Sequence, residues 1–202
     1  MPHTLIYHIT DVANLPGIIA AGGLISDSRL AGNTQTAIGY GHIKQRRMTQ
    51  IRVPCCDNRY VGEFVPFYYC PRSPMLYTIN MGNTGRPRGC QSSIVHLVST
   101  FEFGTSLGAA WAVSDGNAGA FHSIFYTGPN ALVVLNWTAI RATSWSGLVH
   151  QKHAEFLVAD AFPWHGIIKI GCHDSATVQK VKQVMQGQAH QPHVSVEPGW
   201  YY

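Results

Sequence analysis

Apolar positions recur along the chain with two different periods, which predict short strands interleaved with helices. Residues 4–10 (TLIYHIT) are rich in β-branched and aromatic side chains and predict a first strand. A helix should follow over residues 11–21, because the apolar positions 15, 18 and 19 share one face and two glycines come directly after it. Residues 26–36 are polar and predict an exposed loop, whereas residues 40–50 have a helical composition.

The rest of the chain continues this mixture. Residues 63–69 predict a strand in which Pro66 indicates a sheet edge or a bend, since proline cannot donate to a ladder. Ser73 can cap a short helix, residues 82–91 should be a loop, and residues 93–98 form the clearest internal strand. Further strands are expected at 132–135, 152–162, 166–171 and 193–196, with helices at 137–140 and 175–185. Residues 100–130 show no clear pattern.

Strands and helices are mixed without regular βαβ alternation, which favours an α+β fold over a doubly wound sheet. The chain shows no linker or repeat, so residues 1–202 are expected to form a single domain. No apolar run approaches the ~18 residues of a membrane span. The N-terminus also lacks the basic and apolar regions of a signal peptide, so we expect a cytoplasmic protein without membrane contact.

Charged residues make up 12% of the sequence, about half the usual fraction, and the net charge is +4. Most of the positive excess lies between residues 42 and 59, in His42, Lys44, Arg46, Arg47, Arg52 and Arg59. Guanidinium groups bind phosphate oxygens through paired hydrogen bonds, so this cluster indicates a nucleotide or nucleic-acid ligand. A solvated helix face is the alternative interpretation.

Two other chemistries find little support in the sequence. The five cysteines are odd in number and lack a Cys-x-x-Cys spacing, which argues against a disulfide framework and against zinc. No metal site is therefore expected. Gly104–Gly108 matches the G-x-S-x-G elbow of serine hydrolases, but the segment after it is too short for the helix that the elbow requires.

Glu155 is the most informative acidic residue, because it interrupts the apolar segment Ala154–Ala159. A carboxylate on such a strand loses hydration unless a partner binds it, so a salt-bridged strand end and a catalytic carboxylate are both open interpretations. His8 and Thr10 share one face of the first strand, just before a helix N-terminus. That position suits a ribose or phosphate ligand, although a lone strand histidine is more often a core residue.

Several segments, in order along almost the whole chain, resemble the DarT family of DNA ADP-ribosyltransferase toxins. They are Tyr7-His-Ile-Thr10 with Asn14-Leu15, Ile38-x-Tyr40-x-His42-Ile43-x-x-Arg46-Arg47, Val65–Tyr77 (VPFYYCPRSPMLY), Ile94-Val-His-Leu97, Ala154-Glu-Phe-Leu-Val158, Phe162-Pro-Trp164 and Trp200-Tyr-Tyr202. The segment 65–77 is long and chemically unusual, so a chance match there is negligible.

The resemblance implies an ADP-ribosyltransferase fold, in which split antiparallel sheets and surrounding helices form an NAD⁺ cleft. It implies transfer of ADP-ribose from NAD⁺ to a thymine base of single-stranded DNA, with release of nicotinamide and without a metal. It also implies a macrodomain antitoxin as partner. The loop from about residue 105 to Gly147, which faces the acceptor in such enzymes, matches weakly.

The resemblance also implies roles for individual residues. Glu155 and Arg47 correspond to the family's catalytic pair, and the residues expected to bind NAD⁺ are His8, Ile9, Thr10, Gly17, Ile25 and Arg47. Proton abstraction by Arg47 is difficult because a guanidinium stays protonated in proteins. Stabilising the thymine anion, or binding the pyrophosphate, is easier for it. Candidate DNA contacts are Tyr40, His42, Lys44, Arg46 and Arg72.

Two other functions stay open from the sequence. A nucleic-acid-binding module without catalysis would leave Glu155 and His8 unexplained. An NAD⁺-dependent RNA 2′-phosphotransferase has a related fold, but it needs several basic residues around the phosphate, whereas the Arg46–Arg47 pair stands alone beside Glu155.

These expectations lead to a prediction about the form of the acceptor. With labelled NAD⁺, thymine-containing single-stranded DNA should be labelled, and the same strand in a duplex much less, because an unpaired base needs no unstacking. Gel analysis of both forms checks this. Equal labelling of the two, or preferential labelling of RNA, would contradict the acceptor assignment.

Overall fold

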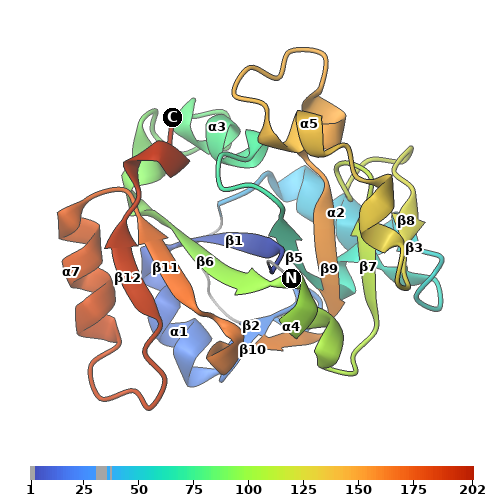
Figure 1. Ribbon diagram of the computed structural model, residues 1–202. Coiled ribbons are helices and arrows are strands. Elements are labelled where there is room, and N and C mark those ends of the chain that lie inside the picture. Colours follow the sequence, from blue (N-terminus) through green and yellow to red (C-terminus); the bar gives the residue numbers. More distant parts are fainter. Residues whose placement is uncertain (1–2, 31–35, 37) are drawn as a thin grey trace.

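The computed structural model describes residues 3–30, 36 and 38–202, and the loop predicted at 26–36 lies partly outside these residues. A mixed sheet of eight strands runs through the molecule in the order β12-β11-β6-β1-β5-β9-β7-β8 (Figure 1). Its strands are β1 (Leu5–Asp11), β5 (Phe64–Tyr68), β6 (Ile94–Thr100), β7 (Trp111–Ser114), β8 (Phe125–Tyr126), β9 (Glu155–Ala159), β11 (Lys169–Cys172) and β12 (His193–Val196).

Two small ribbons and several short helices surround this sheet. One ribbon pairs β2 (Gly23–Ile25) with β10 (Ala161–Pro163), and the other pairs β3 (Arg52–Val53) with β4 (Arg59–Tyr60). The helices are α1 (Leu15–Ala20), α2 (Gly41–Thr49), α3 (Pro74–Asn80), α4 (Phe101–Ser106), α5 (Trp137–Arg141), α6 (Val149–Lys152) and α7 (Ser175–Val184). Among the described residues, no helix has the length and apolar character needed to cross a membrane.

The sheet is nearly split between β1 and β5. β1 pairs with β6 along its whole length and β5 pairs with β9 along its whole length, yet β1 and β5 share only the pair Tyr7–Tyr68. Pro66 lies where the ladder to β1 would continue, and it has no N–H to donate. The sheet edge predicted at Pro66 is wrong, because β5 lies inside the sheet, whereas the alternative of a bend stays a prediction.

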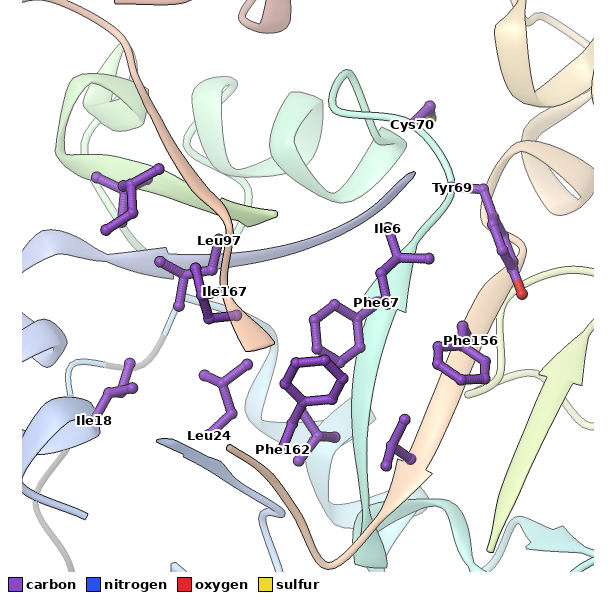
Figure 2. Packing of buried hydrophobic residues seen from close by; sticks show 14 of the residues in the cluster. Ile6, Ile18, Leu24, Phe67, Tyr69, Cys70, Leu97, Phe156, Phe162 and Ile167 are labelled. Carbon is purple, nitrogen blue, oxygen red and sulfur yellow. The ribbon is translucent and has the colours of Figure 1, made fainter. Parts of the chain in front are cut away.

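Apolar side chains from both halves of the sheet meet in one continuous core. Phe67, Phe156 and Phe162 are fully buried and pack ring against ring, with centroids 4.7 Å apart for Phe67 and Phe162 (Figure 2). Ile6 and Leu97 belong to the same cluster, which joins β1 and β6 to β5 and β9. The core thus ties the two half-sheets together where backbone pairing is missing.

Most predicted elements are present, and the exceptions have local causes. Residues 131–134 form a 3₁₀ helix instead of the strand predicted at 132–135. The strand predicted at 152–162 is interrupted, because Asp160 has a positive φ of 65° and separates β9 from β10, while Lys152 belongs to the end of α6. All neighbouring strands of the described large sheet are antiparallel except β11 and β12, which are parallel.

The serine-hydrolase interpretation of Gly104–Gly108 has no support in the structure. Ser106 ends the short helix α4, is exposed, and donates its hydroxyl to the carbonyl of Phe103 at 2.8 Å. Gly104 has a packing role, because a Cβ there would lie 2.4 Å from the ring of Phe156. Gly104 is therefore needed for close packing of the core against Phe156.

Two helical glycines should respond oppositely to alanine. Gly104→Ala forces the Phe156 ring to move and should lower the free energy of unfolding by about 1–3 kcal/mol. Gly17→Ala, in α1, meets no atom within 4 Å and should raise it by up to about 1 kcal/mol. Urea denaturation of both variants checks this, and equal effects would mean that the packing around Gly104 is loose.

Candidate functional site

A cavity of about 590 Å³ opens where the sheet splits, within the range of roughly 300–1,000 Å³ that is usual for small-molecule sites. β1, the start of β5 and helix α2 contribute its walls, together with residues 24–30 and 36–40 where these are described. His8, Ile9, Thr10, Ile25, Tyr40, Lys44 and Arg47 all line it. Seven residues chosen from the sequence therefore meet at one place.

Arg47 and Glu155 form a buried ion pair in the wall of this cavity. Both oxygens of Glu155 accept hydrogen bonds from Arg47, with Nη1 3.1 Å from Oε1 and Nη2 3.0 Å from Oε2. The Glu155 side chain is 1% exposed and that of Arg47 is 13% exposed. Arg47 lines the cavity and Glu155 does not, so the carboxylate lies behind the guanidinium.

The charge state of Arg47 follows from this pairing. Burial by itself would lower the pKa of the guanidinium, but the adjacent Glu155 carboxylate outweighs burial and the pKa of Arg47 is raised above its ordinary value. Arg47 therefore stays protonated. A role for this residue as proton acceptor is physically unfavourable in this arrangement.

The loop between β7 and β8 completes the surroundings of Glu155. The backbone N–H of Ala118 donates to Oε1 at 2.9 Å, and the N–H of Glu155 donates to the Ser114 hydroxyl at 3.1 Å. Sequence reasoning did not identify these groups. A backbone donor carries no residue-type signal, and the segment 100–130 had no clear pattern.

His8 is held in one tautomer by β5. Its Nδ1–H donates to the carbonyl of Pro66 at 2.8 Å, so Nε2 is left as the ring's acceptor nitrogen. Burial lowers the pKa of His8, and the carbonyl of Pro66 and the charge of Asp27 only partly oppose that effect. The histidine is therefore neutral near pH 7, as an acceptor for a ligand hydroxyl requires.

Asn14 connects the first strand to the far wall of the cavity. Its Nδ2 donates to the hydroxyl of Thr10 at 3.1 Å and to the carbonyl of Thr36 at 3.0 Å, while its Oδ1 accepts from the N–H of Thr36. Asn14 was identified only as part of the family resemblance. The structure gives it a specific task, because it fixes the chain at residue 36 against β1.

The remaining predicted cofactor residues differ in their positions. Ile9 and Ile25 line the cavity as apolar wall residues from β1 and the end of β2. Gly17 is exposed on α1 and is not among the lining residues. Its predicted contact with NAD⁺ has no counterpart in the described cavity and stays a prediction.

The predicted DNA-binding residues fall into two groups. Tyr40, His42, Lys44 and Arg46 lie at or beside helix α2, and Lys44 pairs with Asp27 at 2.8 Å across the cavity mouth. Arg72 follows β5 and lines a separate cavity. The structure thus divides a set of residues that the sequence analysis treated together.

Phe121 is an apolar residue that sequence reasoning missed. It is 70% exposed on the β7–β8 loop, and the Arg46 guanidinium lies 5.5 Å from its ring centroid. The same loop supplies the Ala118 N–H that binds Glu155. The exposed ring of Phe121 thus lies beside a cation, on the loop that also binds the buried Glu155 carboxylate. Such a ring is a suitable platform for stacking of a nucleobase.

Within the described residues, no group of three or more histidine, cysteine or acidic side chains is arranged to hold a metal ion. The groups identified at this cavity are the Arg47 guanidinium and the neutral His8 imidazole in its lining, with the Glu155 carboxylate bound to Arg47.

Comparisons with known proteins agree with this geometry. A DNA ADP-ribosyl transferase of Thermus aquaticus is 38% identical over 201 residues, which are 98% of this chain and 89% of the relative. Another from Mycobacterium tuberculosis is 30% identical, covering 100% of this chain and 90% of the relative. Among solved structures, "Thermus sp. 2.9 DarT in complex with ADP-ribosylated ssDNA" superposes with a TM-score of 0.92 at 36% identity, covering 98% and 96% of the two chains.

A second structure, "Thermus sp. 2.9 DarT in complex with NAD+", superposes with a TM-score of 0.89 at 33% identity, covering 100% of this chain and 99% of that one. The family described as "ssDNA thymidine ADP-ribosyltransferase, DarT" matches residues 7–202. With the split sheet and the Arg47–Glu155 pair at its cavity, this chain belongs to the DarT family of single-stranded DNA ADP-ribosyltransferases.

Proposed function

We propose that this protein transfers ADP-ribose from NAD⁺ to a thymine base of single-stranded DNA and releases nicotinamide. The single observation that carries the proposal is the buried Arg47–Glu155 pair in the wall of a cavity lined by His8 and Thr10. Membership of the DarT family supports it, as do the NAD⁺ and ADP-ribosylated DNA bound to the relatives from Thermus sp. 2.9.

The cavity fits NAD⁺ in both polarity and charge. His8 offers an acceptor nitrogen to a ribose hydroxyl, because Pro66 holds its other nitrogen. Lys44 lines the same space and can bind the pyrophosphate, while Ile9 and Ile25 offer apolar contacts to a base. The Lys44–Asp27 ion pair must loosen for Lys44 to take this role.

Glu155 acts on the ribose of the nicotinamide half. Breaking the C1′–N bond leaves an oxocarbenium-like ribose, and the electron pair of that bond leaves with neutral nicotinamide. A carboxylate that accepts a hydrogen bond from the 2′-hydroxyl stabilises this charge as it develops. Since Arg47 lies between Glu155 and the cavity, the guanidinium must give up part of its pairing when NAD⁺ binds.

Arg47 stabilises charge rather than accepting a proton. The N3 nitrogen of thymine loses a proton and forms the new bond to C1′, so negative charge develops on the base before transfer. A protonated guanidinium in a buried wall stabilises that anion, and the raised pKa of Arg47 excludes it as the base. The Glu155 carboxylate, fixed by Ala118, is the proton acceptor that we assign.

The acceptor strand approaches from the side of Phe121. The ring of Phe121 can stack on a nucleobase, and Arg46 beside it can contact the adjacent phosphate.

A nucleic-acid-binding module without catalysis would not need the buried Glu155 carboxylate. The expected macrodomain antitoxin would act on this same modification, and we retain it as the proposed partner.

Replacement of Glu155 by glutamine tests the catalytic assignment. Glu155→Gln keeps the shape of the side chain but removes the charge, so transfer should fall by about a hundredfold or more. Expression of the wild type should be toxic and that of the variant tolerated. Transfer of labelled ADP-ribose to a thymine oligonucleotide and colony counts measure the two effects.

Glutamine is preferable to alanine here, because Glu155→Ala would leave the largely buried Arg47 unpaired and lower stability. Glu102→Gln is the matched control, since Glu102 is an exposed glutamate bound to the N–H of Thr4. Full transfer activity in folded Glu155→Gln, or equal toxicity of the two proteins, would remove Glu155 from the reaction.

Alanine variants of His8 and Phe121 should lose different activities. His8→Ala removes a ligand of NAD⁺, so it should slow hydrolysis of NAD⁺ by water and transfer to thymine alike. Phe121→Ala removes only a surface for the acceptor base and should slow transfer about tenfold while hydrolysis is unchanged. Nicotinamide release with and without DNA separates these effects, and a parallel loss in Phe121→Ala would place Phe121 on the NAD⁺ side.

A further inference from the structure

The donor that binds Glu155 from the side opposite Arg47 lies on a loop. Residues 115–124 join β7 to β8 at one end of the large sheet, where β7 is the neighbour of β9 (Figure 1). Ala118 in this loop donates its N–H to Oε1 of Glu155. Loops move more than the strands they connect, so this donor stays in place only if other contacts fix the loop.

The ring of His150, on helix α6, packs against the start of this loop. A Cβ at Gly116 would lie 2.2 Å from the His150 ring, so the ring rests directly on the Gly116 backbone. Its Nε2 lies 3.6 Å from Oδ1 of Asp115. Helix α6 leads into β9, whose first residue is Glu155. His150 therefore connects the segment that carries the carboxylate to the loop that carries its donor.

His122, farther along the loop, makes a hydrogen bond with the same ring. Its Nε2 lies 3.1 Å from Nδ1 of His150, and the ring centroids are 4.3 Å apart. Such a bond requires a proton on one nitrogen and a free lone pair on the other. Asp115 favours a proton on Nε2 of His150, which leaves Nδ1 to accept from His122. Contacts to His150 thus lie on both sides of Ala118 in the loop.

Neither histidine lines the cavity that we assign to NAD⁺. His122 is exposed and His150 is partly buried. The two rings are therefore placed to act through Ala118 rather than on NAD⁺ itself. Together with Asp115 they do not form a metal site either, because the described part of the chain contains no group of three such side chains arranged to hold an ion.

We propose that His122 and His150 are positioning residues, a histidine clamp that closes the β7–β8 loop on α6 and thereby holds the Ala118 N–H on Glu155. The clamp rests on the proposed function, in which Glu155 acts on the ribose of NAD⁺. That step is shared by hydrolysis and by transfer to thymine, so loss of the clamp slows both reactions. Phe121, the neighbour of His122, differs because it serves only the acceptor base.

The histidine clamp also depends on protonation. Histidine is the side chain whose charge changes between about pH 5 and 8. The titratable groups beside His150 are Asp115 and His122 on the loop and His153 at the end of α6. Once His122 and His150 are both protonated, neither ring has a lone pair to accept with, and two positive charges face each other. The clamp therefore opens as the pH falls.

Two replacements of His122 test the clamp. His122→Ala removes the hydrogen bond, whereas the amide of His122→Gln can take the place of Nε2 and donate to His150. At neutral pH, His122→Ala should slow NAD⁺ hydrolysis and transfer to DNA each about tenfold, with NAD⁺ affinity unchanged. His122→Gln should restore most of both activities. His193→Ala is the control and should match the wild type, since His193 is an exposed histidine on β12 that lines neither described cavity.

The pH profile separates the clamp from a merely structural histidine. From about pH 8 to 5 the wild type should lose activity relative to His122→Gln, because glutamine keeps both a donor and an acceptor throughout this range. Parallel profiles of the two proteins would overturn the clamp. So would a loss in His122→Ala that is confined to transfer and spares hydrolysis, because that result would make His122 a contact of the DNA.

Hydrogen exchange of the Ala118 amide, followed by NMR, tests the clamp without reference to activity. Exchange should be about tenfold faster in His122→Ala and return towards the wild-type rate in His122→Gln. If the wild type transfers no ADP-ribose but exchange depends on His122 in this way, the clamp is supported and the proposed function is wrong. If transfer proceeds and His122→Ala matches His193→Ala in activity and in exchange, the function stands and the clamp is wrong.

Discussion

The ion pair between Arg47 and Glu155 is the interaction on which the site depends. It joins helix α2 to the start of β9, across 108 residues of sequence, and its carboxylate is almost fully buried. A buried charge must be compensated, and Arg47 and the Ala118 N–H together do this. The carboxylate is thereby oriented and shielded from water before any substrate arrives, which is the arrangement that transition-state stabilisation requires.

The cavity that Arg47 lines opens where the sheet is nearly split. Pro66 ends the pairing between β1 and β5. Its carbonyl accepts a hydrogen bond from the Nδ1–H of the His8 side chain. The same residue therefore opens the cavity and sets the tautomer of a residue in it. The aromatic core of Phe67, Phe156 and Phe162 offsets the lost ladder, so the opening does not separate the two half-sheets.

Cations line both described cavities. Lys44 and Arg47 line the larger cavity, while Arg72 and Lys152 line the smaller one. A donor that carries a pyrophosphate and an acceptor strand with a phosphate at every nucleotide both need such cations. Lys44, proposed for the donor, and Arg46 and Arg47, proposed for the acceptor, all lie on helix α2, so the two ligands meet beside this helix.

The sequence by itself determined what depends on neighbouring residues. β1 and α2 follow from local composition and α7 from its periodicity. His8 and Glu155 could be chosen because they are polar residues in apolar segments, and Arg47 because it belongs to a basic cluster and matches the motif of the family. The tertiary structure alone decided how those residues meet, because side-chain periodicity reports which face a residue occupies but not which distant segment packs against it. The Ala118 N–H shows this limit most clearly, since every residue type has that donor and only the packing of the loop makes it a ligand of Glu155.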